Sequence, residues 1–281
     1  MRNLIKTVFL LTLMTVLGVF SGHALGGRPG MIFALGLGGL TCLGLYWASD
    51  RIVLAMHRAQ PLTEDEAPEV FEILRDLSEK AGIPTPRLFM LPSAAANAFA
   101  TGRDPRHSVI AVTHGLVGLL NKEELSGVLG HELAHVLHRD SLLASVVATL
   151  AGALSMIASM FRWSFFWGGE RDDRDRDNPL PLILFVIMMP FVAALIRLSI
   201  SRVREYGADE RGARFCGNPL YLASALRKIE AFSGRFPLRD AVPATAHLFI
   251  TYPLSIQRGG GLFNTHPSVE DRVARLEAMA H

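Results

Sequence analysis

The 281-residue sequence has little charge of either sign and few cysteines. Charged residues make up 19% of the chain against 50% hydrophobic residues, which excludes a disordered chain and an ordinary water-soluble enzyme. The formal net charge is only +2, so we expect no basic surface able to bind nucleic acid. Cys42 and Cys216 are the only cysteines, which excludes a disulfide-stabilised fold. What remains is a membrane protein with one polar domain.

Two apolar runs near the amino terminus are each about as long as a membrane-spanning helix. They cover residues 4–20 and 31–47, and a short connection joins them. We therefore predict a transmembrane hairpin over 1–48, followed by a domain over 49–281. A cleaved signal peptide is the alternative, because Arg2 and a following lysine could form its basic region, but a second apolar run begins almost at once.

The positions of Lys and Arg predict the orientation of the hairpin. Arg2 and Lys6 lie before or at the start of the first run and Arg51 and Arg58 follow the second, whereas only Arg28 lies between the runs. Positively charged flanks stay on the cytoplasmic side of a membrane. Both ends of the hairpin, and the domain that follows, are therefore expected to face the cytoplasm.

Two further hydrophobic segments, 141–161 and 180–200, interrupt the domain on either side of a loop in which Arg and Asp alternate. Pro181, Pro190 and Arg197 are unfavourable in a span that faces lipid, and a helix packed against protein would tolerate them better. Both arrangements remain open at this point.

Residues 60–139 have the composition of a globular domain. The Thr63–Glu66 segment resembles a helix cap, and apolar residues at helical spacing follow it as far as Gly82. Two strand-like runs, 87–91 and 108–113, come next. The sequence therefore predicts a mainly α protein with a small β-sheet, an α+β fold.

The sequence His131-Glu132-Leu133-Ala134-His135 is the most informative part of the chain. Asn121 and the glutamate three residues later predict a helix start upstream, so the pentapeptide should be helical. Residues four apart share one helix face, so both imidazoles can reach one Zn²⁺ while Glu132 faces the water to be activated. His138 could face the same side, but a catalytic zinc usually keeps its fourth position for water.

A third ligand is expected from a different element. Glu205 and Asp209 lie four residues apart on a helical segment, so one could bind zinc while the other accepts the spare N–H of a ligand histidine. The alternative is a charged surface turn in which Arg202, Arg204 and Arg211 pair with these acids.

Several short motifs follow one another along the chain. After the hydrophobic hairpin they are Asn97–Gly102, Gly130–His135, Ser201–Asp209, and Thr265–Pro267 with Arg272 and Leu276 close behind. In this order they resemble the HtpX-type membrane zinc endopeptidases, bacterial relatives of the CAAX prenyl endopeptidases. The resemblance implies a membrane-anchored, zincin-like metalloprotease in the bacterial inner membrane. It also implies a role in degrading damaged or misassembled membrane proteins.

The same resemblance implies specific roles for residues. Zinc would be held by His131, His135 and Glu205, with Glu132 as the general base, and this assignment leaves Asp209 as the partner of a ligand histidine. The substrate backbone would pair with an edge strand formed by Asn97, Ala98, Phe99 and Ala100.

The oxyanion that develops during hydrolysis needs a second donor besides the metal. His266 is the candidate, and the alternative is that this histidine caps the last helix. Tyr206 is a weaker candidate, because it follows a ligand on a helix and should point elsewhere.

Three other functions are kept as alternatives. An intramembrane metalloprotease would carry the pentapeptide inside an apolar span, but charged residues surround it here. A CAAX-type prenyl protease needs a large helical chamber, for which four apolar segments are too few. A non-catalytic, zinc-stabilised scaffold has no need of Glu132 as a base. The expected partners are unfolded or membrane protein substrates and the lipid bilayer, with no nucleic acid, and the sequence gives no oligomeric state.

Overall fold

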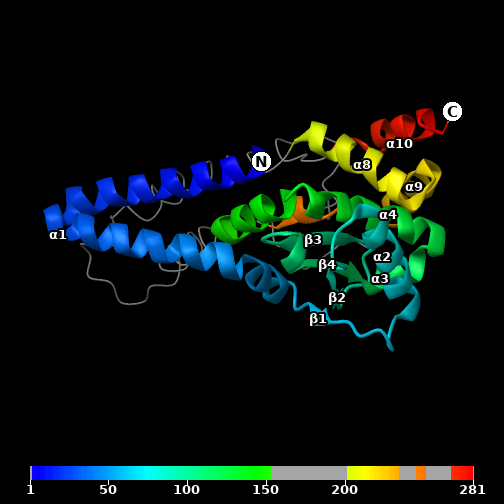
Figure 1. Cartoon of the computed structure of the whole chain (residues 1–281), viewed down its shortest axis with the longest axis horizontal. Coiled ribbons are helices and arrows are strands. Elements are labelled where there is room, and N and C mark those ends of the chain that lie inside the picture. Colours follow the sequence, from blue (N-terminus) through cyan, green and yellow to red (C-terminus); the bar gives the residue numbers. More distant parts are fainter. Residues whose placement is uncertain (1, 153–200, 234–244, 251–266, 281) are drawn as a thin grey trace, which may run out of the picture.

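The computed structural model describes residues 2–152, 201–233, 245–250 and 267–280 (Figure 1). The polar loop between the two later apolar segments, the whole of 180–200 and His266 lie outside these ranges. In chain order the elements are α1 (Arg2–Met56), β1 (Gln60–Pro61), α2 (Pro68–Ala81), β2 (Arg87–Leu91), β3 (Ala98–Gly102), the 3₁₀ turn η1 (Pro105–His107), β4 (Ser108–Thr113), α3 (His114–Leu119), α4 (Lys122–Leu137), an apolar helix Asp140–Gly152, α8 (Arg202–Cys216), α9 (Pro219–Ser233), the 3₁₀ turn η2 (Ala246–Leu248) and α10 (Val269–Ala278). The predicted α+β class with a small sheet is confirmed.

The four strands form one mixed sheet in the order β1-β2-β4-β3. β2 and β4 are parallel, whereas β1 and β3 pair antiparallel with their neighbours. β3 therefore lies at an edge. Within the β3–β4 pair, Thr113 N–H donates to the Asn97 carbonyl, so alternation turns the backbone groups of Ala98, Ala100 and Gly102 away from β4.

The two faces of the sheet are buried against different parts of the chain. Ala98, Ala100 and Ile110 belong to a core shared with α2, α4, α9 and α10. Phe99, between the two alanines, faces the opposite side and packs with residues at the carboxyl end of α1. This follows from the strand period of two, and it places β3 between the helical core and the hairpin.

The start of α2 corrects one sequence expectation. The Thr63 N–H and hydroxyl both bond to the Glu66 carboxylate, as a helix cap would, but they close a turn outside the helix. α2 begins at Pro68, because proline fits the first helical turn, where its missing N–H costs no hydrogen bond. The end is as expected: Gly82 takes the left-handed conformation, with φ of 68°.

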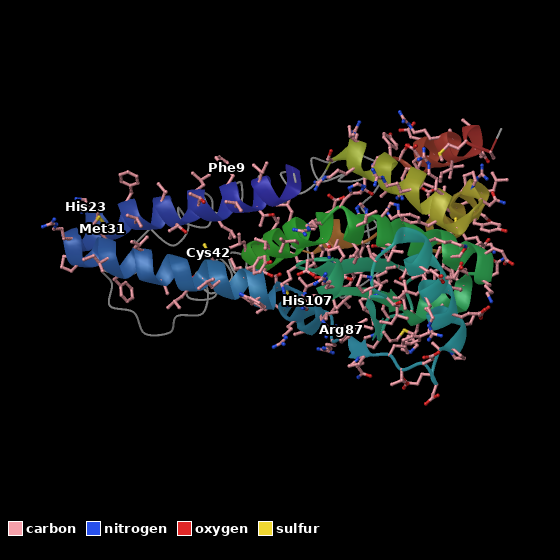
Figure 2. All side chains as sticks on the ribbon, viewed as in Figure 1. Phe9, His23, Met31, Cys42, Arg87 and His107 are labelled. Atoms are coloured by element: carbon pink, nitrogen blue, oxygen red, sulfur yellow. The ribbon has the colours of Figure 1, made fainter. Side chains whose placement is uncertain are left out.

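α1 is folded back on itself into two antiparallel legs (Figure 1). Gly27 has a φ of 58° near the reversal, and the Thr15 hydroxyl lies 3.4 Å from Cys42 Sγ across the legs. Figure 2 labels His23 and Met31 at the tip, whereas both ends of α1 lie toward the globular part. The leg Gly27–Met56 is long and apolar enough to cross a membrane.

The apolar helix Asp140–Gly152 packs against the hairpin. Leu142, Leu143, Val146, Val147 and Leu150 are buried in one cluster with Leu10 and Leu45 of α1. The first half of the predicted segment 141–161 is therefore a helix covered by protein, and the rest of that segment lies outside the described residues.

Candidate metal centre

α4 carries the pentapeptide and is fixed at its start by a reciprocal cap. Asn121 Oδ1 accepts the Glu124 N–H at 2.8 Å, and Glu124 Oε2 accepts the Asn121 N–H at 3.1 Å. The predicted helix start is confirmed. Farther along, the helix is buried on nearly every side, and His131 and Glu132 are each only 1% exposed. Their side chains therefore face protein rather than bulk water.

Three side chains, two from α4 and one from α8, come together beside a pocket. His131 Nε2 lies 3.2 Å from His135 Nε2, and Glu205 of α8 approaches the two nitrogens at 3.9 and 3.6 Å. Tetrahedral Zn²⁺ with bonds of about 2.0–2.1 Å holds its ligand atoms about 3.4 Å apart. The donor set of two imidazole nitrogens and one carboxylate therefore fits zinc in chemistry and in spacing.

The other nitrogen of each histidine is bound to an aspartate. His131 Nδ1 lies 2.9 Å from Asp209 Oδ1, and His135 Nδ1 lies 3.0 Å from Asp140 Oδ2. An acceptor at Nδ1 holds the proton there and leaves Nε2 as the free lone pair for a metal.

Each aspartate is in turn bound by an arginine. Arg272 of α10 reaches both Asp209 oxygens, at 2.6 and 2.9 Å, and Arg204 of α8 lies 3.4 Å from Asp140 Oδ1. Arg272 is 1% exposed and also donates to the Ile250 carbonyl at 2.9 Å. These bonds connect α10, α8 and the 245–250 segment, which are far apart in sequence, around the two histidines.

The charges shift the acid–base properties of the site. Burial raises the pKa of Glu132 to about 7 and lowers that of His131 to about 4. Burial also disfavours protonated His135, but the bond to Asp140 and the charge of Glu205 outweigh it and raise this pKa to about 9. For Asp209 the Arg272 charge outweighs burial, so the pKa falls to about 2.

A pocket that is open to solvent borders the three side chains. Ala100 of β3 forms one wall, Leu248–Ile250 another, and the start of the helix Asp140–Gly152 a third. The Glu132 carboxylate, also in the lining, accepts the backbone N–H of Ala100. The edge strand and the expected base are therefore in direct contact.

The expected substrate strand is already partly occupied. Ala98, Phe99 and Ala100 lie in β3 and Asn97 immediately precedes it, but Ile250 N–H donates to the Ala98 carbonyl at 3.0 Å. At Ala98 the edge of β3 therefore already has a partner, because the 245–250 segment adds to the edge there. The segment is also held by a 2.9 Å bond between Thr245 Oγ1 and His57 Nε2.

Two of the remaining sequence candidates, His138 and Tyr206, are not among the three ligands. His138 forms the C-cap of α4, and Tyr206 packs under Arg275, whose guanidinium carbon is 3.9 Å from the ring centroid. His266 lies outside the described residues. Sequence reasoning missed Asp140 as the partner of His135, although a lone aspartate at the start of an apolar run was a usable signal.

Comparison with known proteins gives a consistent result. Residues 64–280 match the model of Peptidase family M48. The "Protease HtpX homolog" of Syntrophobacter fumaroxidans is 48% identical across 99% of this chain and 100% of its own length. That of Desulfatibacillum aliphaticivorans is 50% identical across 98% of this chain and 89% of its own length.

A solved structure is similar in fold. The crystal structure of S. mikatae Ste24p aligns with a TM-score of 0.52 and 17% identity, over 98% of this chain. The chain spans 65% of that protein, slightly under two thirds of it. At this identity the likeness concerns the fold alone.

Proposed function

The chain belongs to peptidase family M48, and on that premise we propose that it hydrolyses peptide bonds in damaged or misassembled membrane proteins, with Glu132 as the general base. It is an HtpX-like, membrane-associated zinc metalloprotease, and the cluster of His131, His135 and Glu205 is typical of the zinc site in this family. The observation that carries the proposal is the convergence of these three ligands beside Glu132.

The residues around the zinc ligands can carry out the proton transfers of hydrolysis. Zinc, when bound, supplies a Lewis acid that polarises the scissile carbonyl and makes water more acidic. Glu132 is next to a ligand on α4 and has a pKa near 7, so it can take a proton from water and return it to the leaving amine. Asp209 and Asp140 keep the histidines in the orientation that binding requires.

Substrate is held, in this proposal, by backbone pairing with β3. The Ala100 carbonyl and the Gly102 N–H point away from β4, toward the side on which the pocket lies. Backbone pairing depends little on the side chains of the substrate, which suits an enzyme that accepts many unfolded segments. His266 stays our candidate for the second oxyanion donor.

We further propose that both legs of α1 cross the bacterial inner membrane, with the globular part in the cytoplasm. Apolar side chains are exposed along both legs; examples are Phe9 at 67%, Phe20 at 70%, Phe33 at 72% and Leu40 at 70%. Exposure of this kind is costly in water and favourable in lipid. Reporter fusions after Gln60 and at the carboxyl terminus should both report the cytoplasm, and an external report after Gln60 would reverse the orientation.

Glu132→Gln tests the catalytic proposal. The amide cannot act as a base but leaves all three ligands, so cleavage of an unfolded protein should be lost while one zinc per chain remains bound. Glu123→Gln, an exposed change on the same helix, is the control and should cleave at the parental rate. Parental cleavage by Glu132→Gln would remove Glu132 as the base, whereas no cleavage by the parental chain would support the non-catalytic scaffold instead.

A further inference from the structure

The carboxyl end of β3 lies against the part of α1 that leaves the apolar hairpin. Arg103, the residue after β3, stacks on Trp47, with its guanidinium carbon 4.3 Å from the ring centroid. Trp47 is 57% exposed and makes an edge-to-face pair with Tyr46. Amphipathic aromatic rings are enriched at the level where a membrane meets water, and arginine directs its charge outward there. This group therefore marks the membrane surface on the chain.

The length of the hairpin independently places the membrane surface at Trp47. From Gly27 at the reversal to Trp47 there are roughly 20 residues, which is about 30 Å of helix and matches the hydrocarbon thickness of a bilayer. Between Lys6 and Asp50 the only Asp, Glu, Lys or Arg is Arg28, at the tip. Two observations, one from length and one from side-chain contacts, thus agree on where the bilayer ends.

The metal centre lies close to this level. Asp140 binds His135, and the helix that begins at Asp140 is buried within a few residues against Leu10 and Leu45 of the two legs. Ser141, next to Asp140, contacts the Gly102 carbonyl, and the following residue Arg103 stacks on Trp47. The metal centre therefore adjoins the level at which the hairpin enters lipid.

β3 is tied to the same helix at its membrane end. Thr101 Oγ1 lies 2.6 Å from Ser145 Oγ, and Ser141 donates to the Gly102 carbonyl at 3.5 Å. At the other end of β3, Ile250 already bonds to the Ala98 carbonyl. The edge of β3 thus has a contact at each end, at the Ala98 and Gly102 carbonyls, and Ala100 between them lines the pocket.

We propose that this site takes the segment of a substrate that directly adjoins one of its own membrane-spanning helices, and that the segment pairs with β3 at Ala100. The proposal rests on the peptidase function proposed above and names its substrate class. Because the site adjoins the bilayer surface, we expect an extended chain that leaves the membrane to reach it within about ten residues. A shared membrane also raises the effective concentration of such segments.

The test uses a substrate whose sequence is the same at every position. A single-span helix is followed by a long, unstructured repeat, and the full chain is reconstituted with it in phosphatidylcholine vesicles containing zinc. Mass spectrometry of the products should show most cuts within about ten residues of the span. The same repeat without the span should be cut evenly along its length and at least tenfold more slowly.

The possible outcomes distinguish a failure of this proposal from a failure of the proposed peptidase function. Even cutting of the anchored repeat, with peptide hydrolysis intact, would overturn the membrane-adjacent substrate class alone. No cleavage of either substrate would overturn the peptidase function and this inference with it.

Arg103→Gln and Trp47→Ala test the contacts that set the height of β3. Both should move the median cut position outward by several residues while leaving cleavage of the unanchored repeat within twofold of parental. Arg106→Gln, an exposed change in the same turn, should leave the cut positions unchanged. Identical cut positions for all three variants would show that the Trp47–Arg103 contact does not set the register.

Discussion

The two ligand histidines lie one turn apart on α4, yet their surroundings differ. Behind His131, Asp209 receives two bonds from Arg272, at 2.6 and 2.9 Å, and all three side chains are 4% exposed or less. Behind His135, whose side chain is 16% exposed, Arg204 lies 3.4 Å from Asp140 Oδ1. The same residue types therefore form a buried, bidentate arrangement on one side and a looser one at the pocket.

The difference indicates separate tasks. The His131 side joins α4, α8 and α10 and lies inside the main core, so it holds the fold together around the metal. The His135 side borders the pocket and leads through Asp140 into the helix that packs on the hairpin. Breaking a buried pair leaves an uncompensated charge, whereas water can reach the pocket side. Mutations on the two sides should therefore have unequal effects.

Arg272→Ala should have the largest effect. It leaves the Asp209 carboxylate buried with only His131 as a partner, and we expect a loss of about 3–5 kcal/mol in stability. The measurement is the melting temperature of the full chain in detergent, together with its zinc content. Arg275→Ala on the exposed face of α10 is the control, and equal melting temperatures for the two variants would contradict the structural role of Arg272.

Asp209→Asn and Asp140→Asn compare the two sides directly. Asparagine keeps the shape but weakens the hydrogen bond to the ligand, and such changes cost about 10–100-fold in metal affinity. We expect about 100-fold for Asp209→Asn and about 10-fold for Asp140→Asn, measured by competition with a chromogenic chelator. The reverse order would mean that the pocket side dominates zinc binding.

Glu132, between the two sides, predicts a pH effect on metal-free protein. Its folded pKa of about 7 lies above the ordinary value of 4.5, so its contribution to stability is complete below pH 4.5 and is lost as the pH rises through 7. Glutamine does not titrate, so Glu132→Gln should gain roughly 2 kcal/mol relative to parental protein between pH 5 and pH 8. Melting temperatures with chelator at both pH values test this, and a constant difference would contradict it.

Arg204→Gln should have the smallest effect. Its 3.4 Å contact with Asp140 should contribute less than about 1 kcal/mol, because Asp140 keeps its bond to His135. Zinc affinity is expected to stay within threefold of parental. A loss of stability as large as that of Arg272→Ala would remove the contrast between the two sides.

Local sequence signals predicted several elements closely. The strands expected at 87–91 and 108–113 have those bounds, because alternating or continuous apolar runs between turn residues are local patterns. The Asn121 cap was equally readable. The start of α2 was missed because the Thr63–Glu66 pattern fits a turn as well as a helix, and Pro68 decided between them.

The sequence by itself determined the chemistry. It predicts a helix that carries two imidazoles and a carboxylate within five residues, a further acid downstream that can bind the metal, and an apolar hairpin before them. Only the tertiary structure decided which aspartate serves which histidine, that Arg272 and Ile250 close the back of the site, and that β3 ends beside Trp47. The physical reason is the separation along the sequence of the residues that interact. Caps, strands and helix faces depend on neighbours a few residues away, whereas Asp209, Arg272 and Ile250 meet His131 and β3 only after distant segments have packed together.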